Sequence, residues 1–121
     1  MENPPAQNFL IIINDGPYGT ERAYNALRLG MNLVKRPEAA VRVFLVGDGV
    51  VCAKRGQTTP QGYYNIERML KGLAGRATIS ACATCMDARG INEEDFTEGV
   101  KRGSMAQLAE WTAASDKVLV F

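Results

Sequence analysis

Histidine is absent from this chain of 121 residues. Within one chain, this absence excludes every catalytic triad that needs a histidine base and every zinc site with a histidine ligand. The sequence also has no long basic run, and its formal net charge is only +1. Because nucleic-acid-binding surfaces are built from clustered positive charge, we expect no direct contact with DNA or RNA.

The sequence has no long hydrophobic run either. The longest, Phe9 to Ile13, is too short to cross a bilayer, so we expect no membrane partner. The first eight residues are polar and proline-containing, and they lack the charged head and apolar middle of a secretory signal. We therefore expect a cytoplasmic protein with a flexible N-terminal segment, residues 1–8, and a single domain over residues 9–121.

Short apolar segments alternate along the chain with segments of helical periodicity. Strands are predicted at residues 9–13, 40–46, 77–81 and 117–121, with a very short one within 99–103. Helices are predicted at residues 20–35, 65–75 and 105–115, with Thr20, Asn65 and Ser104 as N-caps, and a short one after Asn92. This alternation predicts an α/β fold in which helices cover both faces of a parallel sheet.

Cysteine is scarce, with three residues in the chain. An odd number without an export signal argues against a disulfide framework and favours thiol or metal chemistry. Cys82 and Cys85 directly follow the predicted strand 77–81, and open parallel sheets place their chemistry at the carboxyl ends of strands. We therefore favour a functional role for this pair. Cys52, flanked by small and apolar residues, is interpreted as a packing residue.

The residues alone leave four interpretations of the pair open. Cys82 and Cys85 could supply half of a zinc site that two copies complete, although the usual second pair of ligands is missing. They could form a thioredoxin-like redox couple, but that arrangement needs a helix to begin at the pair, and we predict a loop over residues 82–90. They could also be structural cysteines of a non-catalytic oligomeric binding module.

The fourth interpretation is a nucleophilic thiolate that carries sulfur as a persulfide. An unperturbed thiol is only about 3% thiolate at pH 7, so this role needs a lowered pKa. Arg89 is the nearby cation in the sequence and is the candidate stabiliser of the Cys82 thiolate, while Asp87 would oppose it. Cys85 could then release Cys82 by forming an internal disulfide.

A glycine-containing segment, Gly16 to Thr20, precedes a predicted helix and could cradle a phosphate, as in flavin-binding sheets. It has neither a P-loop nor a G-x-G-x-x-G pattern, and a tight turn between strand and helix explains its glycines equally well. We therefore predict no bound cofactor and no resident metal.

The sequence resembles the DsrE/DsrF-like family of small sulfur-relay proteins, and most closely its YchN-like branch. The resemblance extends from about Phe9 to Phe121. Its matching motifs are Pro17-Tyr18-Gly19, Arg55-Gly56-Gln57, Gly62-Tyr63 with Asn65-Ile66, Cys82-Ala83-Thr84-Cys85 with Asp87, Arg89, Gly90 and Ile91, Leu108-Ala109 with Trp111, and Asp116-Lys117-Val118-Leu119 with Phe121.

The resemblance implies a flavodoxin-like three-layer fold with a five-stranded, mainly parallel sheet flanked by helices. It also implies homo-oligomers, trimers or hexamers, with the active cysteines near subunit contacts. Its functional implication is intracellular sulfur transfer between donor and acceptor proteins. The family's persulfide-carrying cysteine matches Cys82, and Cys85 matches a position that some branches fill with a second cysteine.

Overall fold

The computed structural model describes residues 6–121. The strands are β1 (Gln7–Ile13), β2 (Ala39–Leu45), β3 (Thr78–Cys82), β4 (Val100–Gly103) and β5 (Lys117–Val120). The α-helices are α1 (Arg22–Leu33), α2 (Ile66–Ala74), α3 (Ala83–Ala88) and α4 (Met105–Ala114), and the 3-10 helices are η1 (Gly47–Ala53) and η2 (Glu93–Asp95). No helix in this part of the chain is long and apolar enough to cross a membrane.

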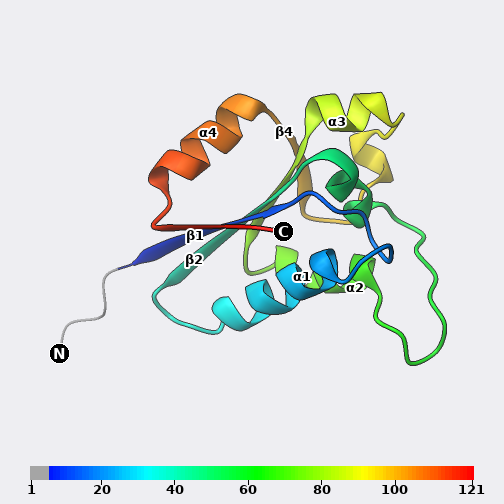
Figure 1. Ribbon diagram of the computed structural model, residues 1–121, viewed down its shortest axis with the longest axis horizontal. Coiled ribbons are helices and arrows are strands. Elements are labelled where there is room, and N and C mark those ends of the chain that lie inside the picture. The colour runs from blue at the N-terminus through cyan, green and yellow to red at the C-terminus, as the bar shows by residue number, and fades with distance from the viewer. Residues whose placement is uncertain (1–5) are drawn as a thin grey trace.

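The strands form one sheet in the order β4-β3-β2-β1-β5, and every pairing between neighbouring strands is parallel. The helices α1 and α2 lie on one side of this sheet and α4 lies on the other (Figure 1). The predicted three-layer α/β fold with a five-stranded sheet is therefore confirmed. All the strand ends that carry loops 14–21, 46–65 and 83–99 point to one edge, as parallel pairing requires.

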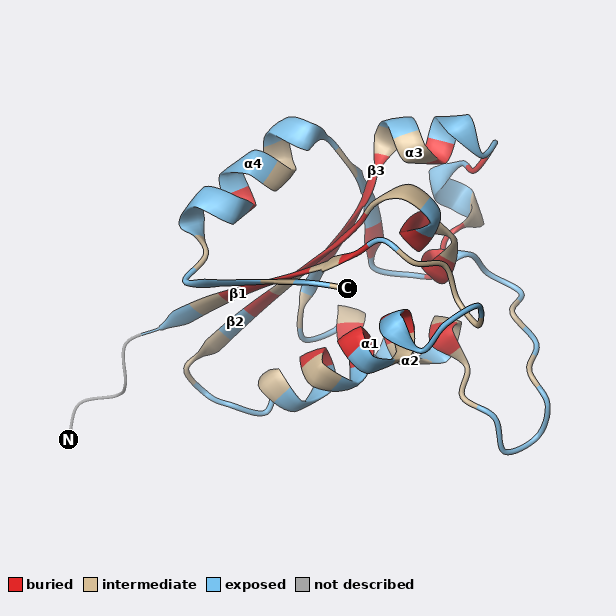
Figure 2. Cartoon of the chain, in the orientation of Figure 1, coloured by how far each residue is buried: buried red, intermediate tan, exposed pale blue. Residues whose placement is uncertain are grey.

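The core runs along the central strands, which are buried on both faces (Figure 2). On the α4 side, Trp111 packs edge-to-face on Phe44 with 6.0 Å between ring centroids. On the opposite side, Leu70 and Leu73 of α2 are buried, and Leu73 lies beside Gly30 of α1. Because side chains from both layers fix the strands, their carboxyl ends form a firm base for the segments that follow them.

Two predicted boundaries near the N-terminus are wrong. β1 begins at Gln7, so two of the eight residues predicted to be flexible belong to the sheet, while residues 1–5 lie outside the described part. The helix predicted from Thr20 begins at Arg22 with Glu21 as its N-cap residue. The Thr20 hydroxyl donates to Asp15 Oδ2 at 2.6 Å, so it closes the preceding turn and does not occupy the N-cap position.

The predicted loop over residues 82–90 is also wrong, because its first part is the helix α3. Asn65 and Ser104, in contrast, cap α2 and α4 as predicted, each accepting a backbone N–H three residues ahead. The start of α3 has no such polar cap, since its N-cap residue is Cys82 itself.

Candidate functional site

Cys82 is both the last residue of β3 and the N-cap residue of α3. Its backbone is extended (φ −62°, ψ 121°), and the chain turns from strand into helix directly after it. Only 3% of Cys82 is exposed, yet its Sγ lies 3.2 Å from the hydroxyl of Thr84, an exposed residue. The sulfur therefore lies one side chain below the surface, at the edge where parallel sheets place their chemistry.

Hydrogen-bond donors from the first turn of α3 surround this sulfur. Burial alone raises the pKa of Cys82, but the Thr84 hydroxyl, the Cys85 thiol and the backbone N–H groups of both residues outweigh it. The pKa of Cys82 consequently lies below its ordinary value. The backbone donors are free for this purpose because the first turn of a helix leaves its N–H groups without intrahelical partners.

Cys85 lies one turn further along α3 and is half-buried. Its Sγ accepts a hydrogen bond from the Gly47 N–H at 3.1 Å, which links α3 to the start of η1. Burial and the neighbouring Cys82 raise the pKa of Cys85, and the Gly47 N–H and Arg89 lower it by less. The two thiols are therefore unequal: Cys82 ionises first, and Cys85 keeps the proton that it donates to Cys82.

Arg89 does not bind Cys82, as the sequence suggested, but contacts Asp48 and Cys85. Its guanidinium donates to Asp48 Oδ1 from Nε at 3.1 Å and from Nη2 at 2.9 Å, and Nη1 donates to the Cys85 carbonyl at 3.0 Å. The site thus brings Arg89 to Cys85 and to η1, with no hydrogen bond from its guanidinium to Cys82 Sγ among the described residues. The predicted role of Arg89 as direct stabiliser of Cys82 has no contact to support it.

Sequence reasoning missed another cation beside the pair. Arg102 of β4 forms a two-pronged ion pair with Asp87 of α3, with Nη1–Oδ1 at 2.9 Å and Nη2–Oδ2 at 2.8 Å. In the sheet, Arg102 lies opposite Ala81 and the next residue, Gly103, lies opposite Cys82. This proximity depends on the register between β3 and β4, which α3 and η2 separate in the sequence, and no local sequence pattern reports it.

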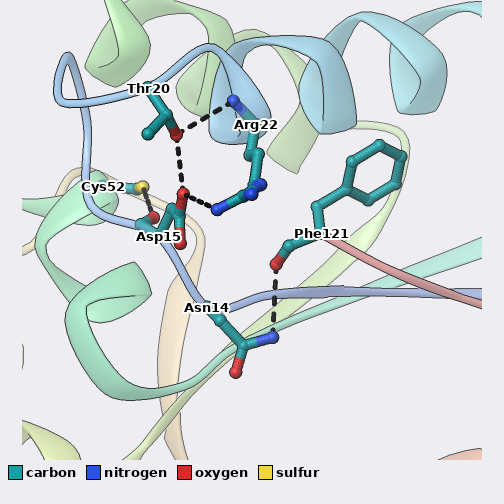
Figure 3. Close-up of polar contacts among 6 residues, drawn as sticks. All are labelled: Asn14, Asp15, Thr20, Arg22, Cys52 and Phe121. Carbon is teal, nitrogen blue, oxygen red and sulfur yellow. Dashed lines mark hydrogen bonds and ion pairs between the residues drawn. The ribbon is translucent and has the colours of Figure 1, made fainter.

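Cys52 is a packing residue, as predicted. It is fully buried in η1, and its Sγ donates to the Asp15 carbonyl at 3.4 Å (Figure 3). Burial raises the pKa of Cys52 to about 12, so this thiol stays protonated at neutral pH. The same figure shows Asp15 held by Thr20 and Arg22, which fixes the loop after β1.

A cavity of about 480 Å³ opens between this loop and η1. It is lined by Asp15, Gly16, Pro17, Gly19, Thr20, Asp48 and Val51. The glycine segment considered as a phosphate cradle thus faces two carboxylates, Asp15 and Asp48, which oppose an anion. Within residues 6–121, no group of three or more Cys, Asp or Glu side chains is close enough to hold a metal ion.

Comparisons with known proteins agree with this architecture. Residues 7–121 match the model of the DsrE/DsrF-like family. Protein YchN of Escherichia coli (strain K12) is 40% identical over 117 residues, covering 95% of this chain and 99% of its own. Sulfurtransferase TusD of Buchnera aphidicola (subsp. Acyrthosiphon pisum) is 25% identical over 127 residues, covering 94% and 99%. The crystal structure of the E. coli ychN protein matches the fold with a TM-score of 0.89 at 39% identity, covering 95% of this chain and 99% of its own.

Proposed function

The chain belongs to the DsrE/DsrF-like family, and we propose that it is a sulfur-relay protein that carries sulfane sulfur as a persulfide on Cys82. The observation that carries this proposal is the set of hydrogen bonds that lowers the pKa of Cys82 at the end of β3. The similarity to a protein named as a sulfurtransferase supports the same chemical class.

The relay consists of two exchange steps at sulfur. The Cys82 thiolate attacks the outer sulfur of a donor persulfide, so a new S–S bond forms on Cys82, the donor's S–S bond breaks and the donor leaves as a thiolate. An acceptor thiolate then attacks the outer sulfur on Cys82, which regenerates the Cys82 thiolate and leaves a persulfide on the acceptor. A lowered pKa favours both steps, because Cys82 is first the nucleophile and then the leaving group.

Cys85 competes with the acceptor in the second step. As a thiolate it would attack the inner sulfur, forming a Cys82–Cys85 disulfide and expelling hydrosulfide. Its raised pKa keeps Cys85 mostly protonated and slows this side reaction. Because Cys82 is only 3% exposed, the persulfide is also shielded from bulk solvent between the two transfers.

The proposal includes the setting in which the relay works. The partners are sulfur donor and acceptor proteins in the cytoplasm, where thiols stay reduced. A homo-oligomer, a trimer or a hexamer, is proposed as the working form, and exposed apolar side chains on the edge strand β5 support it: Val118 is 39% exposed and Val120 is 65% exposed. Light scattering on the purified chain measures the oligomer number, and a monomer would refute this part.

Intact-protein mass spectrometry tests the proposal. The reduced chain is incubated with a cysteine desulfurase and cysteine, or with thiosulfate and a rhodanese, and its mass is compared with that of Cys82→Ser. A gain of one sulfur atom that disappears in Cys82→Ser is expected. A gain that survives the substitution, or no gain from either donor, would refute the assignment.

Thiol-disulfide exchange is the second candidate, and the start of α3 at Cys82 favours it. A pair that opens a helix, with its first thiol at the N-terminus, is the arrangement of thioredoxin-like redox couples. This function predicts a reversible Cys82–Cys85 disulfide with a measurable reduction potential and no persulfide under the same donors.

A further inference from the structure

We propose that Arg102, held in place by Asp87, is the positioning cation of the thiol site and stabilises the negative charge on Cys82. This role concerns the thiolate itself and extends to the persulfide only if the proposed relay is correct. The two claims are therefore tested by different measurements.

The strand register places the backbone of Arg102 beside the end of β3. Cys82 and Gly103 are partners across β3 and β4, so the neighbouring strand presents no side chain directly beside Cys82. A Cβ at position 103 would be crowded, because it would lie 3.1 Å from Ser80 Cβ and 3.2 Å from Phe44 Cε2 and would displace the end of the Gln107 side chain. Successive side chains of a strand point to opposite faces, so Arg102, the partner of Ala81, leaves β4 on the other face from Cys82. Its guanidinium reaches the edge where Cys82 lies through the ion pair with Asp87 of α3.

Asp87 then fixes where the guanidinium lies. The carboxylate is five residues beyond Cys82, on the last turn of α3, and both of its oxygens accept from Arg102. The guanidinium therefore bridges β4 and α3 at the end of β3, where Cys82 connects that strand to that helix. A two-pronged Arg–carboxylate pair holds this position more firmly than a single contact would.

The other charged groups around Cys82 leave this role open. Arg89 is held by Asp48 of η1 and by the Cys85 carbonyl, and its charge acts on Cys85. Cys85 keeps its proton, and Glu93 of η2 and Asp87 add negative charge near Arg102. Asp87 is the first cause that raises the pKa of Arg102, and the charge on Cys82 adds to it in the same direction. This effect, the smallest of those that act on Arg102, is consistent with the geometric assignment.

The expected effect is modest, because Asp87 offsets part of the charge and the Arg102 side chain is 41% exposed. In Arg102→Gln, alkylation of Cys82 at pH 7 is expected to slow by about threefold, with the midpoint of its pH profile moved upward. Arg102→Lys keeps the charge but loses the planar fork, so it is expected to restore part of the rate.

The experiment uses the neutral reagent iodoacetamide, so that charge does not steer the probe. Cys82 and Cys85 share the tryptic peptide Ala77–Arg89, and fragment ions assign the label to one or the other. Lys117→Gln is the matched control, since it removes the same charge from β5, at the opposite edge of the sheet. Circular dichroism of each variant verifies that the fold is intact.

A slower Cys82 reaction in Arg102→Gln, partial recovery in Arg102→Lys and an unchanged rate in Lys117→Gln support the proposal. The difference between native chain and Arg102→Gln is also expected to shrink at high salt. Superimposable pH profiles for native chain and Arg102→Gln, or an equal shift in Arg89→Gln or Lys117→Gln, would overturn it. If the chain gains no sulfur in the mass-spectrometry test, the relay is refuted. The alkylation rates still decide whether Arg102 stabilises the Cys82 thiolate.

Discussion

The hydroxyl of Thr84 offers the sharpest test of how α3 activates Cys82. Thr84→Val keeps the shape and the β-branch of the side chain and removes the 3.2 Å hydrogen bond to the Cys82 sulfur. Because this hydroxyl favours the thiolate, its loss raises the pKa of Cys82. Because Thr84 is exposed, we take the bond at about 1 kcal/mol, below the roughly 1.5–3 kcal/mol of a hydrogen bond to a charged group, and this corresponds to about a fivefold loss of thiolate.

The assay is the rate of Cys82 alkylation from pH 5 to pH 10, read from the Ala77–Arg89 peptide. Thr84→Val should react about fivefold more slowly than the native chain on the acidic limb and equally fast on the alkaline plateau, where both are ionised. Thr84→Ser, which keeps the hydroxyl, is the control and should follow the native profile. If Thr84→Val also follows it, the hydrogen bonds of α3 do not set the ionisation of Cys82.

Three further predictions concern Cys52, the glycines and Arg89. Cys52 stays protonated to about pH 12 in the folded chain, but it ionises near its ordinary pKa of 9.0 in the unfolded chain. Because the unfolded chain then binds fewer protons, the free energy of unfolding of the native chain should fall by about 1.4 kcal/mol per pH unit above pH 9, relative to Cys52→Ala. Urea unfolding measures this difference. Gly49→Ala should lower the free energy of unfolding by about 3 kcal/mol in the same assay, because its Cβ would lie 2.1 Å from a β1 carbonyl oxygen. Gly19→Ala is the control and should change it by less than about 0.5 kcal/mol, because nothing lies within 4 Å of its Cβ. Equal costs for the two variants would contradict the close approach at Gly49. Arg89→Gln should slow the alkylation of Cys85 and leave the alkylation rate of Cys82 unchanged, because the Arg89 charge lowers the pKa of Cys85. Slower alkylation of Cys82 would instead assign Arg89 to the Cys82 thiolate.

The elements that the sequence predicted well are those with strong local signals. The buried run in β1 and the caps at Asn65 and Ser104 are set by residues within a few positions, and the structure keeps them. The helix α3 was missed because it has six residues, one buried apolar side chain, Met86, and no polar cap. Its stability comes from tertiary bonds, such as the Gly47 N–H to Cys85, which a sequence pattern does not report.

The same limit applies to the candidate site. Cys82 and Cys85 were identifiable because their spacing and their position after a strand are local features. The partners of the two arginines were not, since Asp48 lies 41 positions from Arg89 and Asp87 lies 15 positions from Arg102. Such pairings depend on strand order and register, which one sequence does not specify.

In the proposed relay Cys82, and not Cys85, carries the transferred sulfur. The direct measurement is the position of the extra sulfur after a single loading reaction, trapped by alkylation and located by fragment ions in the Ala77–Arg89 peptide. We expect a trapped persulfide on Cys82 in the native chain, with equal or greater yield in Cys85→Ser, where no internal disulfide can release it. A persulfide located on Cys85, or one that requires Cys85 to form on Cys82, would contradict it.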